Sequence, residues 1–278
     1  MSGTPRIGGG GGHLRLAGKV VLVTGATGIA AETTLLAARE GASVFVASLH
    51  ADDCRALATT VERETGSAAV AFHAGDLTDA ATANDALADC IARFGRVDAV
   101  FNVAGLSGRR FGDGPVHECT EEGWDMTLAS NARSTFLVCR AALRVLLAQS
   151  VGENGQRGAI LNMGSVLAAF PEPHHFATHA YAASKAAIVG LSRSMAAYYA
   201  PHKIRVNVLA PGLVRTPMSR RAQDDPAILA RMKTKQPLAE NLLDPAAIAR
   251  VAVFLLSDDA AMITGQVLDV DGGWKVSS

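Results

Sequence analysis

The chain has no excess of charge of either sign, no paired-cysteine pattern and no long apolar run. Lysine and arginine together number 26, and so do aspartate and glutamate, which makes the formal net charge at pH 7 zero. A balanced charge creates no overall field that would attract nucleic acid or an anionic membrane. We therefore expect no nucleic-acid and no membrane partner, and a small molecule as the ligand.

Cysteine usage and apolar segments indicate the compartment. The cysteines show neither CxxC spacing nor the pattern of a secreted disulfide scaffold; they are Cys54, Cys90, Cys119 and Cys139. Reduced thiols of this kind are typical of cytoplasmic proteins. No segment reaches the length of a membrane span, and the first residues lack an apolar run of signal-peptide length. We expect a cytoplasmic protein whose residues 1–13, with five consecutive glycines, form a flexible tail.

Short β-branched runs alternate with longer alanine-rich segments through the rest of the chain. Strands are predicted at residues 20–24, 43–48, 69–74, 99–102, 159–163, 205–209 and 266–270, with helices at 30–40, 52–65, 80–94, 121–149 and 181–200. Apolar strands joined by helices are typical of a parallel sheet that is covered on both faces. Residues 14–278 are therefore predicted to form a single α/β domain, a doubly wound parallel, Rossmann-like sheet of about seven strands. Its ligand crevice is expected at the carboxyl ends of the strands.

A glycine turn follows the first predicted strand. Gly25 and Gly28 permit a tight turn and let backbone N–H groups approach a pyrophosphate at the start of the next helix. An ordinary strand-to-helix loop can carry the same glycines. The position of this turn, after the first strand and before a further βαβ unit, favours a dinucleotide site.

Tyr181 and Lys185 place a phenol and an ammonium one helical turn apart on the same face. A free tyrosine has a pKa of about 10, and a neighbouring lysine stabilises the phenolate and lowers that pKa. This spacing also occurs by chance on solvated helices. With a dinucleotide site upstream and the hydroxyl of Ser165 as a partner, the pair indicates acid–base catalysis.

In their order along the chain, the motifs resemble those of the short-chain dehydrogenase/reductase family. They are Thr24-Gly25, Asp76-Leu77, Asn102-Val103-Ala104-Gly105, Asn131, Ser165, Tyr181-x-x-x-Lys185 and Pro211-Gly212. The resemblance covers about residues 16–274 and is to the short-form members. Two positions depart from the family pattern. The glycine loop is one residue shorter than usual and carries Ala31 in place of its last glycine, and Val103 replaces a second asparagine.

The resemblance implies an NAD(P)-dependent oxidoreductase that interconverts a secondary alcohol and a ketone. Tyr181 would be the acid/base, and Lys185 would lower its pKa and hold the nicotinamide ribose. Ser165 would orient the substrate oxygen. Asn131 would kink its helix and hold a water molecule that links Lys185 to solvent.

The resemblance also implies the cofactor contacts. They are expected at Gly25, Thr27, Gly28, Ile29, Ser48, His50, Asp76, Leu77, Asn102, Ala104, Gly105, Tyr181, Lys185, Pro211, Gly212, Val214 and Thr216. In NAD sites an acidic residue at the end of the second strand accepts the ribose hydroxyls. Ser48 takes that place here, which favours NADP, although no arginine stands beside it and His50 is the only nearby candidate for the phosphate.

Three segments are expected to form the substrate pocket: residues 106–111, residues 166–178 and a lid at about 217–238. Arg109 and Arg110 are candidates for binding a substrate carboxylate or phosphate, or they form a solvated pair. His175 and His179 have a spacing that can bind a metal on a helix, but Glu172 is the only third ligand available. We expect these histidines to form the pocket rim and expect no metal site.

Family members form dimers or tetramers, so the resemblance implies a homodimer or homotetramer. The helices that carry Asn131 and Tyr181 would form one interface, and residues 267–274 would suit a second, although Trp274 can equally close the core of one subunit. A non-catalytic dinucleotide-binding regulatory protein on the same fold stays open as the alternative, because the shortened glycine loop could alter cofactor geometry. An epimerase or dehydratase fits the glycine spacing but needs a longer substrate domain after Pro211.

Overall fold

The computed structural model describes residues 14–66 and 70–277. The tail at 1–13 and residue 69, which was predicted to begin the third strand, lie outside the described residues. Within them seven parallel strands form one sheet in the order β3-β2-β1-β4-β5-β6-β7. The strands are β1 Val20–Thr24, β2 Ser43–Ser48, β3 Val70–Ala74, β4 Ala99–Asn102, β5 Gly158–Met163, β6 Ile204–Pro211 and β7 Val267–Val270. The predicted doubly wound parallel sheet is confirmed.

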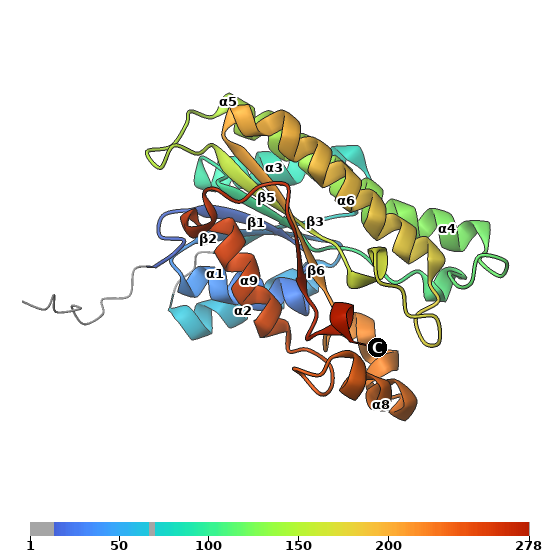
Figure 1. The fold of residues 1–278 in the computed structure, drawn as a ribbon. Helices are drawn as coiled ribbons and strands as arrows, with labels where there is room; N and C mark the ends of the chain where they lie inside the picture. The colour runs from blue at the N-terminus through green and yellow to red at the C-terminus, as the bar shows by residue number, and fades with distance from the viewer. Residues whose placement is uncertain (1–13, 67–69, 278) are drawn as a thin grey trace, which may run out of the picture.

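Helices cover both faces of the sheet, which explains why its central strands β1, β4 and β5 are buried throughout (Figure 1). One face carries α1 Ile29–Arg39, α2 Ala51–Thr65 and α9 Pro245–Leu256, and the other carries α3 Ala80–Phe94, α5 Ser134–Ala148 and α6 His179–Tyr199. Alternate side chains of β1 enter the two cores: Val21 and Val23 pack on one side, and Val20 and Leu22 pack on the other. A strand with two buried faces cannot show the alternating pattern of a half-exposed strand.

The helix predicted at 121–149 is interrupted in its middle. It consists of α4 Glu121–Leu128, a π turn at Ala129–Arg133 and α5, and the residues at both junctions keep right-handed helical angles. A π turn adds a residue to one helical turn and is found mostly where function requires a side chain to be redirected. Asn131 lies in this turn and is fully buried. The local opening brings its side chain toward the loop after β4.

The segment between β6 and α9 forms a small unit at one end of the molecule (Figure 1). It contains a single turn at Pro217–Ser219, then α7 Arg220–Gln223 and α8 Pro226–Lys235. An apolar cluster joins α7 and α8 to the C-terminal turn Trp274–Val276; its buried members are Val166, Ala222, Ile228, Met232 and Trp274. The indole of Trp274 is 1% exposed and donates a hydrogen bond to the carbonyl oxygen of Phe170 at 3.1 Å. Trp274 therefore packs within its own subunit. In the part of the chain that the structure describes, no helix combines the length and apolar character needed to cross a membrane.

Candidate functional site

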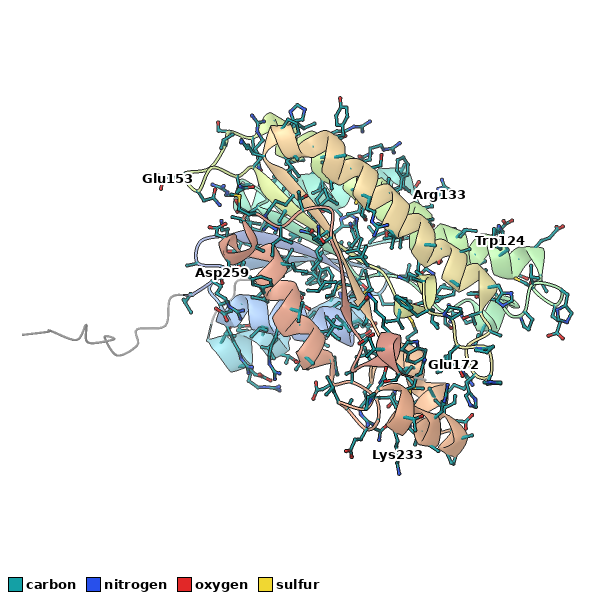
Figure 2. The ribbon with its side chains drawn as sticks, in the orientation of Figure 1. Trp124, Arg133, Glu153, Glu172, Lys233 and Asp259 are labelled. Atoms are coloured by element: carbon teal, nitrogen blue, oxygen red, sulfur yellow. The ribbon has the colours of Figure 1, made fainter. Side chains whose placement is uncertain are left out.

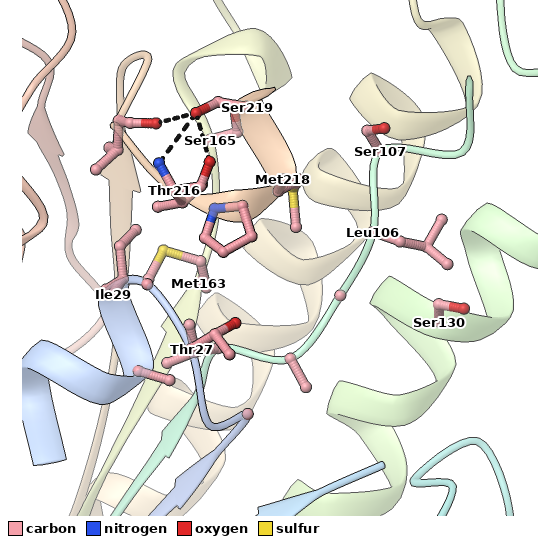
Figure 3. A pocket seen from close by; sticks show the side chains of 18 of the residues that line it. Thr27, Ile29, Leu106, Ser107, Ser130, Met163, Ser165, Thr216, Met218 and Ser219 are labelled. Atoms are coloured by element: carbon pink, nitrogen blue, oxygen red, sulfur yellow. Dashed lines mark hydrogen bonds between the residues drawn. The ribbon is translucent and has the colours of Figure 1, made fainter. Parts of the chain in front are cut away.

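A cavity of about 510 Å³ opens at the carboxyl ends of the strands. Residues after all seven strands line it, together with residues of α6 and α7. Figure 3 shows Thr27 and Ile29 on one side of this space and Leu106, Ser107 and Ser130 on the other. The predicted site residues that line it are Gly25, Thr27, Gly28, Ile29, Ser48, His50, Asp76, Leu77, Ala104, Gly105, Ser165, Tyr181, Lys185, Pro211, Gly212, Val214 and Thr216. The structure thus brings together residues that span most of the chain.

The glycine turn has the geometry that a phosphate cradle requires. Gly25 and Gly28 have φ angles of 90° and 56°, which disfavour any residue with a side chain. A Cβ atom on Gly28 would lie 2.9 Å from Cγ2 of Thr216. Gly28 also begins α1, and no side chain caps that helix start. The N–H of Ala30 donates to the Thr27 carbonyl oxygen at 3.2 Å, and the helix start without a side-chain cap suits an anion such as the pyrophosphate of a dinucleotide.

Thr24 fixes the adjacent wall of the cavity. Its buried hydroxyl oxygen accepts the N–H groups of Val103 at 2.9 Å and Ala104 at 3.0 Å. These bonds connect the end of β1 to the loop after β4, so the glycine turn and residues Ala104 and Gly105 keep a fixed relation. A β-branched hydroxyl residue at the end of a buried strand is the signal that identifies this role in the sequence.

The end of the cavity near β2 and β3 carries polar groups that suit an adenosine. Ser48, His50 and Asp76 line it, with Leu77 as a buried apolar wall. The Asp76 carboxylate accepts the N–H of Thr78 at 2.9 Å, which fixes the turn after β3. Asp53, from the first turn of α2, also lines this end, and sequence reasoning missed it because α2 was placed only as a helix.

Ser165, Tyr181 and Lys185 meet at the other side of the cavity. Lys185 is 3% exposed; its Nζ donates to the carbonyl oxygen of Met163 at 3.0 Å and lies 5.6 Å from the centroid of the Tyr181 ring. Ser165 follows β5, and its hydroxyl forms a hydrogen bond with the Tyr181 phenol. This places a hydroxyl, a phenol and an ammonium around one small volume, which is the arrangement needed to orient an oxygen and move its proton.

Burial dominates the protonation of these groups. Desolvation raises the pKa of Tyr181, and the hydrogen bond with Ser165 opposes this rise without cancelling it. Desolvation also lowers the pKa of Lys185 to about 8. Burial therefore outweighs other influences on the Tyr181 pKa, and the expectation that Lys185 lowers this pKa stays a prediction. The lysine is buried as well, and burial disfavours its charged form.

Asn131 does not line the cavity but supports it. Its Oδ1 accepts the N–H of Leu106 at 2.8 Å, and its Nδ2 donates to the Leu106 carbonyl and to Oγ of Ser184, each at 3.0 Å. Ser184 in turn donates to the carbonyl oxygen of Tyr181 at 2.7 Å. Asn131 thereby connects the loop after β4 with the first turns of α6.

Asn102 is placed away from the cavity. Its side chain is 2% exposed and donates to Oδ1 of Asn162 at 2.8 Å and to the Cys139 sulfur at 3.3 Å, beneath the sheet edge. Asn162 continues this chain to Ser192 of α6 at 2.8 Å. The alternation of side chains along β4 directs this amide toward the helices, so it does not line the cavity, and a cofactor contact at Asn102 stays a prediction.

Gln236 does not line the cavity but supports the segment after β6, a role that sequence reasoning missed. It is fully buried; its Oε1 accepts the N–H of Leu213 at 2.5 Å, and its Nε2 donates to the carbonyl oxygens of Leu213 and Asn241. These bonds hold the segment after β6 against the cavity. Ser219 stabilises the same segment, since its hydroxyl accepts the N–H of Thr216 at 3.0 Å and donates to the Val214 carbonyl (Figure 3).

The two histidines suggested for a metal have other contacts. Nδ1 of His179 accepts the N–H of Val116 at 2.9 Å, and the His175 ring lies edge-on to Phe176. The Glu172 carboxylate accepts the N–H of His175 at 2.8 Å. Among residues 14–66 and 70–277, no group of three potential metal ligands gathers.

Comparison with known proteins agrees with this geometry. The family model described as enoyl-(acyl carrier protein) reductase matches residues 23–275. D-threitol dehydrogenase of Mycolicibacterium smegmatis is 38% identical over 94% of this chain and 95% of its own length. A 2,5-dichloro-2,5-cyclohexadiene-1,4-diol dehydrogenase of Sphingobium indicum is 34% identical over 94% of this chain and 98% of its own.

Solved structures are similar over the same span. The 3-ketoacyl-(acyl-carrier-protein) reductase from Brucella melitensis, complexed with NADH, has a TM-score of 0.82 at 29% identity, covering 94% of this chain and all of its own. Levodione reductase has a TM-score of 0.83 at 28% identity and covers 94% of this chain. The chain belongs to the short-chain dehydrogenase/reductase family of NAD(P)-dependent oxidoreductases, which confirms the resemblance found in its sequence.

Proposed function

We propose that the protein interconverts a secondary alcohol and a ketone, with Tyr181 as the acid/base. The observation that carries this proposal is the meeting of Ser165, Tyr181 and Lys185 in the cavity that the glycine turn also lines. Bound NAD(P) or its reduced form would take or supply the hydride. The chain's own residues orient the reacting oxygen, move its proton and exclude water.

Each side chain then has a definite task. In the reduction direction, Ser165 donates to the carbonyl oxygen, and the protonated Tyr181 gives its proton to that oxygen as the alcohol forms. The raised pKa of Tyr181 keeps the phenol protonated for this step at neutral pH. Lys185 lies close enough to favour the phenolate afterwards. Asn131 connects α6 to the loop after β4 and holds their relative position. It would also position a water molecule near Lys185.

Turnover and cofactor binding of Tyr181→Phe test this assignment. NADH and NADPH are titrated by fluorescence, and nicotinamide absorbance follows a panel of secondary alcohols and ketones. We expect loss of turnover with cofactor affinity nearly unchanged, because the phenol transfers the proton to the substrate oxygen and contributes little to binding of the dinucleotide. Undiminished turnover would remove the acid/base role. Cofactor binding without turnover in the unaltered protein would favour the alternative, a non-catalytic dinucleotide-binding regulatory protein.

We propose NADP as the preferred cofactor. Ser48 at the end of β2 presents no carboxylate to repel a 2′-phosphate, and His50 lines the same part of the cavity. Asp53 opposes this preference, because its carboxylate lines the same end. Comparing the dissociation constants of NADH and NADPH decides between the two.

We further propose a cytoplasmic homodimer or homotetramer in which residues 217–238 act as a lid over the substrate. Exposed apolar side chains on the helical path α4–α5 support assembly: Trp124, Met126 and Phe136. Trp124 lies on the outer surface of α4 (Figure 2). Met218 and Arg221 line the cavity from the proposed lid, which supports its role in closing the site. Light scattering measures the assembly, and protease protection of 217–238 by cofactor and substrate measures the closure.

A further inference from the structure

Two arginines from distant parts of the chain meet at the substrate end of the cavity. Arg109 lies in the turn Arg109–Phe111 after β4, and Arg221 lies in α7 of the proposed lid. Their Nη2 atoms donate to the same carbonyl oxygen, that of His175, at 2.9 and 3.0 Å. Both side chains line the cavity. Two guanidinium groups are thereby held close together although their charges repel.

Asp113 acts on Arg109 through its negative charge but forms no ion pair with either arginine. Within the described residues, neither Arg109 nor Arg221 forms an ion pair with a carboxylate. Glu172, the nearest carboxylate in the sequence around His175, faces Arg231 of α8, with 3.7 Å between Oε1 and Nε, and it does not line the cavity. It lies at the same end of the molecule as Lys233 of α8 (Figure 2).

Asp113 is also engaged elsewhere. Its two carboxylate oxygens accept the N–H groups of Ala180 and Tyr181, each at 3.0 Å. The carboxylates that do line the cavity, Asp53 and Asp76, follow β2 and β3, on the far side of β1 from the strands that precede the arginines. The substrate end is therefore positive and the opposite end carries the acidic groups.

Arg109 is half-buried and Arg221 is exposed. Desolvation lowers the pKa of Arg109, the charge of Arg221 lowers it further, and the charge of Asp113 opposes both. One carbonyl oxygen uses a single donor of each guanidinium, whereas each has five. Both arginines line a cavity that is also lined by Phe176 and Trp274, an apolar wall against which a small substrate can pack. An oxyanion placed between two such forks would receive charge-assisted hydrogen bonds from both.

We propose that Arg109 and Arg221 form an anion-binding subsite, so that the substrate is a small hydroxy or oxo compound carrying a carboxylate or a phosphate. This inference rests on the proposed oxidoreductase function. The reaction joins the ketone, the reduced cofactor and a proton to give the alcohol and the oxidised cofactor, and the anionic group takes no part in it. Binding the anion orients the carbonyl toward Ser165 and Tyr181.

Matched substrate pairs test the subsite. Reduction of acetoacetate and levulinate is compared with that of their methyl esters, and dihydroxyacetone phosphate with dihydroxyacetone, so that the carboxylate and phosphate forms are distinguished. The variants are Arg109→Gln and Arg221→Gln. Arg220→Gln is the control, since Arg220 is the exposed neighbour of Arg221, pairs with Asp224 and does not line the cavity. Binding of the same compounds to the cofactor-saturated protein is measured by calorimetry.

We expect the unaltered protein to favour the anionic member of at least one pair. Each variant should lower kcat/KM for that member by roughly 10- to 100-fold, the loss expected for one charged hydrogen-bond partner, and lower it much less for the neutral member. Equal losses for both members would show that the arginines only brace the His175 loop. Weaker NADH or NADPH binding in the variants would assign them to the cofactor. Failure of every anion to react or bind would overturn the subsite, whereas turnover of a neutral ester would still support the proposed function.

Discussion

The carboxylate of Asp113 caps the helix that carries Tyr181. One oxygen accepts the N–H of Ala180 and the other accepts the N–H of Tyr181, each at 3.0 Å. Asp113 is 5% exposed and lies in the loop after β4, 68 residues before Tyr181. A negative charge at this helix start also interacts favourably with the helix dipole. The loop after β4 therefore fixes the position of the first turn of α6, and with it the position of Tyr181, the proposed acid/base.

Asp113→Asn should reduce both stability and turnover. An amide offers one acceptor oxygen, so its NH₂ group would face a buried backbone N–H that has no other partner. We expect a loss of about 1–3 kcal/mol in the free energy of unfolding. We expect kcat to fall roughly 10- to 100-fold as Tyr181 shifts, with cofactor affinity nearly unchanged.

Denaturant titration and steady-state kinetics measure these two effects. Asp125→Asn, an exposed carboxylate on α4, is the matched control. A positioning role also predicts a shift in the pH profile of kcat, because the surroundings of the Tyr181 phenol change. Wild-type kinetics in Asp113→Asn would show that the cap does not position the tyrosine.

Gly105→Ala should disturb the packing of Asn131 against the loop after β4, which lines the cavity where the cofactor is proposed to bind. A Cβ atom at this position would lie 2.4 Å from Oδ1 of Asn131 and 3.8 Å from Nζ of Lys185, so the asparagine clamp on Leu106 has to move. We expect weaker cofactor binding and lower turnover. Gly190→Ala, in the middle of α6 with no atom within 4 Å of the added Cβ, is the control and should stabilise the protein by about 0.5–1 kcal/mol. Unchanged cofactor affinity in Gly105→Ala would argue against a tight wall at this position.

Much of the fold and of the cavity lining could be predicted because both depend on local signals. Each strand is a short apolar run, and residues that follow parallel strands must gather at one edge of the sheet. This argument places Gly25 and Ser165 at that edge, whereas Thr216 is implied only by the family resemblance. The resemblance implies a kink at Asn131, but the residues at Ala129–Arg133 do not themselves indicate a π turn, because the opening depends on bonds to Leu106 and Ser184.

The remaining site residues depend on contacts between distant segments. Asp113 has no local pattern that indicates a helix cap, because the helix it caps begins far along the chain. Arg221 was expected only as part of a polar lid, and its meeting with Arg109 requires the loop at His175 between them. Asn102 was assigned to the cofactor from its motif alone, although its position on β4 directs it into the core.

Ser48→Asp should reverse the proposed cofactor preference. Ser48 is half-buried at the end of β2 and lines the cavity, so a carboxylate there would repel a 2′-phosphate and accept ribose hydroxyls. We expect the dissociation constant of NADPH to rise about tenfold or more, with that of NADH unchanged or lower. Ser48→Asn is the neutral control of similar size. If the ratio of the two constants stays the same in Ser48→Asp, residue 48 does not face the adenosine ribose.

Lys185→Met should remove a pH dependence of stability. Burial lowers the pKa of Lys185 from 10.5 to about 8, so between these values the unfolded chain holds a proton that the folded chain has released. The free energy of unfolding should therefore rise with pH across this window, by roughly 3 kcal/mol in all, and show no such contribution below pH 8. Lys185→Met should lack this rise because methionine does not titrate.

Denaturant titrations of both proteins from pH 7 to pH 10.5 measure the difference, in which the titration of all other groups cancels. Lys233→Met, an exposed lysine of α8, serves as the control and should keep the wild-type slope. The variant also leaves the Met163 carbonyl without its partner, but that loss lowers stability by the same amount at every pH. The loss of this hydrogen bond therefore shifts the plot of unfolding free energy against pH without changing its slope. Parallel curves for the unaltered protein and Lys185→Met would mean that Lys185 keeps an ordinary pKa in the folded state, and that its full positive charge is available to the phenolate of Tyr181.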